Sequence, residues 1–176
     1  MEAVQARPKH TDIPAKAVAE KLADDVMAWL GGEGGSRESV IDDLEKAIAY
    51  GLDGYAIAKY LDNDCSWNVD ADLVEILENA YWIRSSLHDK AVEAWVLACG
   101  IKPRLQLGTP VKVKNRATGN KVLDGQIVSI DEKRGTYTVC IEALGHVREG
   151  MGTTGSVLPF EDVERWTAEL AEGAKS

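Results

Sequence analysis

The sequence predicts an α+β protein, in which an acidic helical domain precedes a small β module and a terminal helix. Apolar residues recur at helical spacing through the first hundred residues and alternate with polar residues from about residue 107 onward. The charge changes at nearly the same place, because residues 1–100 hold 9 Lys/Arg and 19 Asp/Glu, whereas residues 101–176 hold 11 and 10. We therefore expect a helix with a Gly-rich linker (1–35), a helical domain (36–103), and the β module with its C-terminal helix (104–176).

The first helix is expected to be capped by Thr11 or Asp12 and to end at Gly31, where the glycine-rich stretch "GGEGGS" begins. Four glycines in six residues make this stretch costly to order, so it reads as a linker. The apolar stripe of the helix needs a cover. The helix can dock on its own chain or exchange with the same helix of a second copy, which would give a homo-oligomer.

The next helices have recognisable starts. Ser36 and Asp53 precede apolar-periodic segments and are placed to cap them. A longer periodic segment runs from Asp70 to Gly100, and Asn68 or Asp70 is expected to cap it. It is expected to break near Ser85–Ser86, because about thirty residues is long for one helix. The helix after Ser36 is expected to bury Val40, Ile41, Leu44, Ala47 and Ile48.

The β module consists of short alternating runs separated by turns. Strands are expected over 108–114, 121–131, 136–144 and 156–159, and a closing helix over 160–170. Gly125 marks a bend in the second strand. Ile127, Ile130 and Val139 are expected to point inward. Four or five short strands over about fifty residues suit a small closed barrel better than a sandwich.

Residues 107–165 resemble an SH3-like barrel of the Tudor or KOW type. The resemblance rests on the motifs Gly108-x-x-Val111-x-Val113, Gly125-x-Ile127-x-x-Ile130-Asp131, Tyr137-x-Val139 and "LPFEDVE". It implies a small barrel that contacts a partner. The whole chain, a compact acidic helical unit joined to such a module, looks like an accessory protein of a phage or mobile element.

Motifs for catalysis or cofactor binding are weak. "GMGTTG" (150–155) matches a dinucleotide fingerprint but precedes a strand instead of the helix that a pyrophosphate needs. The loop 64–75 has calcium-like spacing, yet Val69 stands where the turn requires glycine. Cys140 and His146 have no third orienting group. The three histidines are scattered along the chain. We expect no enzyme activity, no cofactor and no metal.

Basic residues of the β module form the first candidate site. Two of them alternate with apolar residues on the first strand, and the others flank its turn or lie at the tip of the next hairpin. The predicted basic surface consists of Lys112, Lys114, Arg116, Lys121, Lys133 and Arg134. Such a surface can follow a nucleic-acid backbone. The alternative is that strand lysines only prevent edge-to-edge aggregation.

Acidic residues of the helical half form the second candidate site. The predicted acidic surface consists of Asp42, Asp43, Asp70, Asp72 and Glu75. These charges repel DNA and attract basic protein surfaces. The sequence therefore favours a binding or adaptor protein with a protein partner, and with nucleic acid as a second partner class. The alternative is a phage-encoded inhibitor of a host defence system, such as an anti-CRISPR or anti-restriction protein, whose acidic surface mimics nucleic acid.

Localisation is expected to be cytoplasmic. Cys65, Cys99 and Cys140 are too few and too far apart for a disulfide framework and read as small buried residues in a reducing compartment. The N-terminal residues lack the apolar region of a secretory signal, and the chain has no apolar run of about 18 residues. No membrane partner is expected.

Overall fold

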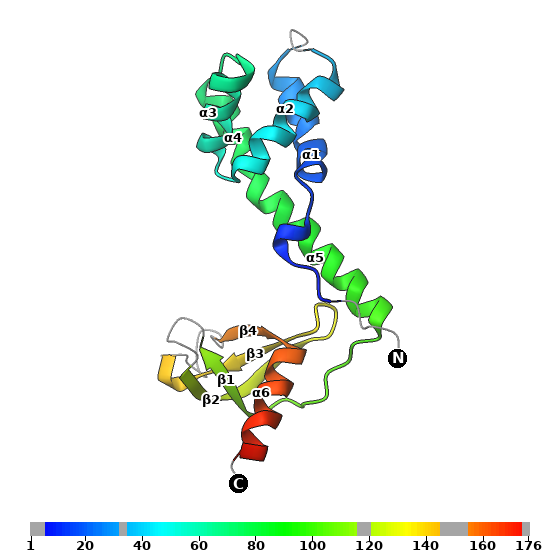
Figure 1. Ribbon diagram of the computed structural model, residues 1–176, viewed down its shortest axis with the longest axis vertical. Coiled ribbons are helices and arrows are strands. Elements are labelled where there is room, and N and C mark those ends of the chain that lie inside the picture. The colour runs from blue at the N-terminus through cyan, green and yellow to red at the C-terminus, as the bar shows by residue number, and fades with distance from the viewer. Residues whose placement is uncertain (1–5, 32–34, 116–120, 145–154, 174–176) are drawn as a thin grey trace. The chain divides into compact units, whose positions relative to one another are not determined.

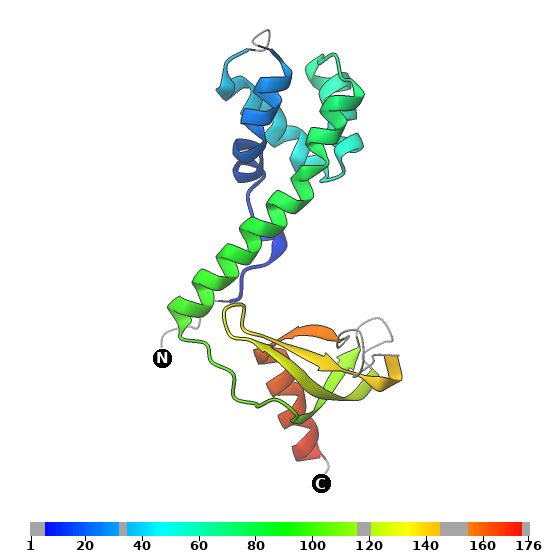
Figure 2. The ribbon, with the colours of Figure 1, turned by 180° about the vertical axis from the view of Figure 1, so that it is seen from behind.

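A computed structural model describes residues 6–31, 35–115, 121–144 and 155–173. The chain divides into two compact units, one of which is Ala6–Val92 while the other contains Glu93–Ser176. The first unit is helical, and the second contains an antiparallel sheet and a terminal helix (Figures 1 and 2). The predicted α+β class is confirmed.

The helical unit is built from short helices around one apolar core. They are α1 (Ala15–Trp29), α2 (Arg37–Tyr50), α3 (Gly54–Cys65), α4 (Ala71–Leu77) and the first part of α5 (Asn79–Cys99). The five residues predicted to be buried on α2 are all buried. They pack with Leu22, Val26, Ile57, Leu61, Leu73 and Leu77 in a single cluster.

Helix starts follow the predicted caps with one exception. The side chains of Ser36, Asp53 and Asp70 accept backbone N–H bonds at the starts of α2, α3 and α4. The predicted cap at Thr11 or Asp12 is wrong, because those residues lie in a 3-10 turn (η1, His10–Asp12) and α1 begins after Pro14. A proline disfavours helical backbone in the residue before it, which keeps η1 separate from α1.

The expected break in the long helical segment lies at Glu78 and not at Ser85–Ser86. Gly54 approaches this point so closely that a Cβ there would lie 2.7 Å from the Glu78 nitrogen. The Asn79 amide also donates to the Ile76 carbonyl oxygen (3.1 Å), a local bond that competes with the helical ladder. The break therefore coincides with a close approach of α3 and with a local side-chain bond.

The apolar stripe of α1 is covered within its own unit. Val18, Ala19, Leu22, Ala23 and Val26 are buried, and α1 packs against α2 and α4. The Arg37 guanidinium reinforces the contact, donating to Asp24 Oδ1 (2.7 Å) and to the Glu20 carbonyl oxygen (3.1 Å). This stripe does not need a second copy of the chain to cover it.

The second unit contains a four-stranded antiparallel meander. Its strands are β1 (Pro110–Asn115), β2 (Lys121–Asp131), β3 (Thr136–Cys140) and β4 (Ser156–Pro159), in the order β1-β2-β3-β4. The strand expected over 136–144 ends at Cys140, and Glu142–Leu144 forms a 3-10 turn (η3). Among the described strands β1 and β4 are the two ends of this order, so closure into an SH3-like barrel stays a prediction.

Helix α6 (Phe160–Gly173) packs on the sheet and completes its core (Figure 1). Its residues Phe160, Val163 and Trp166 join Val111, Val113, Ile127, Tyr137, Val139 and Ile141 in one cluster, with Ile130 partly buried beside it. Gly125 lies where a Cβ would be 2.5 Å from Cγ1 of Val139. Only a hydrogen fits at this position without a shift of its neighbours, whereas the irregularity of β2 lies between Ile127 and Ser129.

Candidate functional site

The basic surface predicted for the sheet is spread along β2. Lys121 begins this strand and Lys133 follows its end, so the two lie at opposite ends of an eleven-residue strand. Lys112 and Lys114 alternate with the buried Val111 and Val113 on β1, as predicted. Arg116 and most of the "GMGTTG" motif lie outside the described residues.

Carboxylates neutralise part of this surface. The Lys112 ammonium is paired with Asp124 on the facing strand. Arg134 lies 3.9 Å from Asp131 and 4.0 Å from Glu93. Asp131 also accepts the backbone N–H groups of Lys133 (3.0 Å) and Arg134 (3.1 Å), which shapes the hairpin tip. Phosphate binding by these cations would have to displace such pairs.

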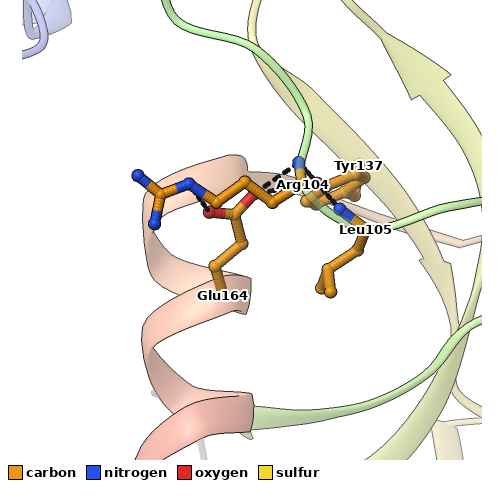
Figure 3. A network of polar contacts seen from close by, with 4 residues as sticks. All are labelled: Arg104, Leu105, Tyr137 and Glu164. Atoms are coloured by element: carbon orange, nitrogen blue, oxygen red, sulfur yellow. Dashed lines mark hydrogen bonds and ion pairs between the residues drawn. The ribbon is translucent and has the colours of Figure 1, made fainter.

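A buried tyrosine fixes the segment that leads into the sheet (Figure 3). The Tyr137 hydroxyl accepts the N–H groups of Arg104 (3.1 Å) and Leu105 (3.0 Å) and donates to Oε1 of Glu164 on α6 (3.0 Å). Burial raises the pKa of Tyr137; the Leu105 N–H acts in the opposite direction, and Glu164 adds to the rise. This network is structural, and no motif in the sequence indicates that the three segments meet.

Two of the five predicted acidic residues meet at one cavity of the helical unit. Asp43 on α2 and Asp70 at the start of α4 line a cavity of about 500 Å³ together with Trp29 and Trp67. The other predicted acids, Asp42, Asp72 and Glu75, are exposed and are not among its lining residues. The charge pattern of the sequence identifies the acids, whereas the tryptophans read as ordinary core and loop residues.

Each tryptophan is tied to one of these carboxylates. The Trp29 Nε1–H donates to Asp70 Oδ1 (3.0 Å), and the Trp67 Nε1–H donates to Asp43 Oδ2 (3.2 Å). Asp70 Oδ1 also accepts the Leu73 N–H (2.9 Å), the helix cap predicted for this residue. Asp43 further contacts Lys46 (3.3 Å). The cavity therefore has aromatic walls and two carboxylates held in fixed positions.

A second polar cluster joins residues 8–10 to α5. The His10 ring lies 5.6 Å from the His88 ring and 5.9 Å from the Tyr81 ring, and His88 Nε2 lies 3.1 Å from the Pro8 carbonyl oxygen. Burial lowers the pKa of His10, and His88 and Arg84 lower it further. His10 and His88 are far apart in the sequence but lie together in the structure, so these two histidines are not scattered. His146 lies outside the described residues.

In the parts of the chain that the structure covers, no helix has the length and apolar character to cross a membrane. Within the same ranges, no three His, Cys, Asp or Glu side chains gather as a group that could hold a metal ion. Comparisons with protein-family models, curated proteins and solved structures found no match to this chain.

Proposed function

We propose that this chain is a non-enzymatic binding protein whose helical unit contacts a basic surface of a partner protein. The observation that carries this proposal is negative charge combined with exposed aromatic rings on one unit. Residues 6–92 hold 17 Asp/Glu and 9 Lys/Arg, and Tyr50, Tyr55 and Trp82 are 84%, 67% and 69% exposed. Aromatic residues are enriched in protein interfaces, and charge complementarity selects a basic partner.

In the narrower form of the proposal, the partner surface is the nucleic-acid-binding groove of a host defence protein. Carboxylates would occupy the positions of phosphates, and the chain would act as a competitive inhibitor. The charge of the helical unit supports this form. A competition experiment distinguishes the inhibitor from an adaptor. An inhibitor of this kind displaces DNA or RNA from its target, whereas an adaptor leaves the nucleic acid bound.

A contact between the sheet unit and nucleic acid is the second part of the proposal. The alternation of Lys112 and Lys114 with buried valines supports it, whereas the pairing of Lys112 with Asp124 weakens it. A gel shift of mixed DNA and RNA at low salt tests it directly. Binding that is lost in Lys112→Ala/Lys114→Ala supports the nucleic-acid contact, and absence of any shift overturns it.

The protein contact is tested by a quantitative pull-down from a bacterial lysate with washes at rising salt. The comparison uses the wild-type chain and the triple variant Asp42→Asn/Asp72→Asn/Glu75→Gln, which removes three exposed charges without altering the cavity. We expect basic proteins to be retained by the wild type, released by salt and depleted from the variant sample. Retention of the same proteins by both chains would overturn the proposal.

A further inference from the structure

The cavity that contains Asp43 and Asp70 is built by three separate segments of the helical unit. Trp29 comes from the end of α1, Asp43 from α2, and Trp67 and Asp70 from the connection between α3 and α4. Its volume of about 500 Å³ lies within the range of sites that hold a small ligand or a large side chain.

The tryptophan rings are held in place by bonds across these segments. The bond from Trp29 to Asp70 joins residues 41 apart in sequence, and the bond from Trp67 to Asp43 joins residues 24 apart. Both rings also pack against the apolar core of the unit. An incoming group therefore meets aromatic walls whose N–H donors are already satisfied.

The charge at the cavity is negative. Its lining includes two carboxylates and no Lys, Arg or His. Asp43 is partly compensated by Lys46, which contacts its Oδ1. Both hydrogen bonds to Asp70 use Oδ1, and within the described chain Oδ2 accepts none. The Asp70 carboxylate therefore keeps an oxygen with which to accept a bond from a ligand.

We propose that this cavity receives one cationic side chain, arginine or lysine, from a basic segment of a partner protein. Aromatic rings attract cations and cover the apolar stem of such a side chain, while a carboxylate accepts its N–H bonds. Arginine is preferred, because its planar guanidinium stacks on aromatic rings and is weakly hydrated. The inference rests on the proposed function, since it names the group by which the acidic unit recognises its partner.

The test is an NMR titration of the full-length ¹⁵N-labelled chain with small blocked amino acids. The probes are N-acetyl-arginine-methylamide, its lysine equivalent, and the citrulline equivalent, which has nearly the shape of arginine without its charge. We expect the Trp29 and Trp67 indole signals to move in fast exchange with a millimolar Kd for arginine, a weaker one for lysine, and no movement with citrulline.

Variants separate a binding role from a structural one. Asp70→Asn keeps a helix cap and an acceptor for the Trp29 indole, and Asp43→Asn keeps an acceptor for Trp67, so each removes mainly charge. We expect each change to weaken arginine binding about fivefold or more, whereas the matched control Asp62→Asn, at an exposed residue of α3 that does not line the cavity, leaves the affinity unchanged. Because the two cavity variants act on different helices, loss of folding in one leaves the other as the test.

Three results would overturn the inference: no indole shift at 50 mM arginine probe (roughly fiftyfold above a Kd of about 1 mM), equal shifts with citrulline, or unchanged affinity in both cavity variants. The pull-down stays independent, because it varies acids outside the cavity. Salt-sensitive capture of basic proteins without any probe binding would refute the binding role of the cavity and still support the proposed function. Probe binding without such capture would refute the proposed function.

Discussion

Removal of the Tyr137 hydroxyl tests how the sheet unit is held together. In Tyr137→Phe the ring stays packed against Phe160 (centroids 4.2 Å apart), but three hydrogen bonds are lost. The Arg104 N–H keeps Glu164 Oε1 as an acceptor (3.0 Å), whereas the Leu105 N–H loses its acceptor. Two bonds are therefore lost without replacement, and at about 1 kcal/mol for each the free energy of unfolding should fall by about 2 kcal/mol.

The measurement is a urea titration of the full-length chain followed by the indole signal of Trp166, which lies in the core of the sheet unit. A loss of about 2 kcal/mol lowers the midpoint of this transition by roughly 1–2 M urea. The control is Tyr50→Phe, which alters a ring that is 84% exposed and should leave the midpoint in place. A Trp166 midpoint that is the same in Tyr137→Phe as in the wild type would refute the role assigned to the network.

Three further changes follow from the fold. Gly125→Ala places a Cβ 2.5 Å from Val139 and should cost about 1–3 kcal/mol by the same Trp166 assay; an unchanged midpoint would show that β2 can move away. Ser36→Ala removes the cap of α2 and should cost about 1 kcal/mol of helical-unit stability in thermal melts, with Ser36→Gly nearer the wild type. The lowered pKa of His10 means that the unfolded chain takes up a proton first as pH falls below 6.5, so stability should decline with acidification. Melts of His10→Gln should show a shallower decline between pH 7.5 and 5.5, and an identical decline would exclude His10 as its source.

Local features of the fold could be predicted from the sequence, because they depend on residues close together in the chain. Ser36, Asp53 and Asp70 cap the helices that follow them, and β2 and β4 have the predicted bounds. The break at Glu78 could not be predicted in the same way. It coincides with the close approach of Gly54, which periodicity along α4 and α5 does not encode.

The candidate sites likewise combine features that the sequence predicts with features that depend on packing between distant segments. The acids could be identified from charge alone, but the meeting of Asp43 with Asp70 depends on how three helical segments pack, and so does the role of the tryptophans. The basic surface was predicted from alternation on one strand. The neutralisation of Lys112 could not be predicted, because Asp124 faces it only through the register of β1 with β2.

The most direct test of whether the acidic helical unit is the binding surface is a pair of titrations of the ¹⁵N-labelled full-length chain. One uses an arginine-rich peptide and the other a DNA duplex, both at low salt, where exposed charges interact most strongly. We predict that the peptide shifts amide signals within residues 6–92, with the largest changes at Asp43, Trp67 and Asp70, and that the duplex shifts none of these. Shifts confined to Lys112 and Lys114 with the duplex, and none with the peptide, would contradict the proposal.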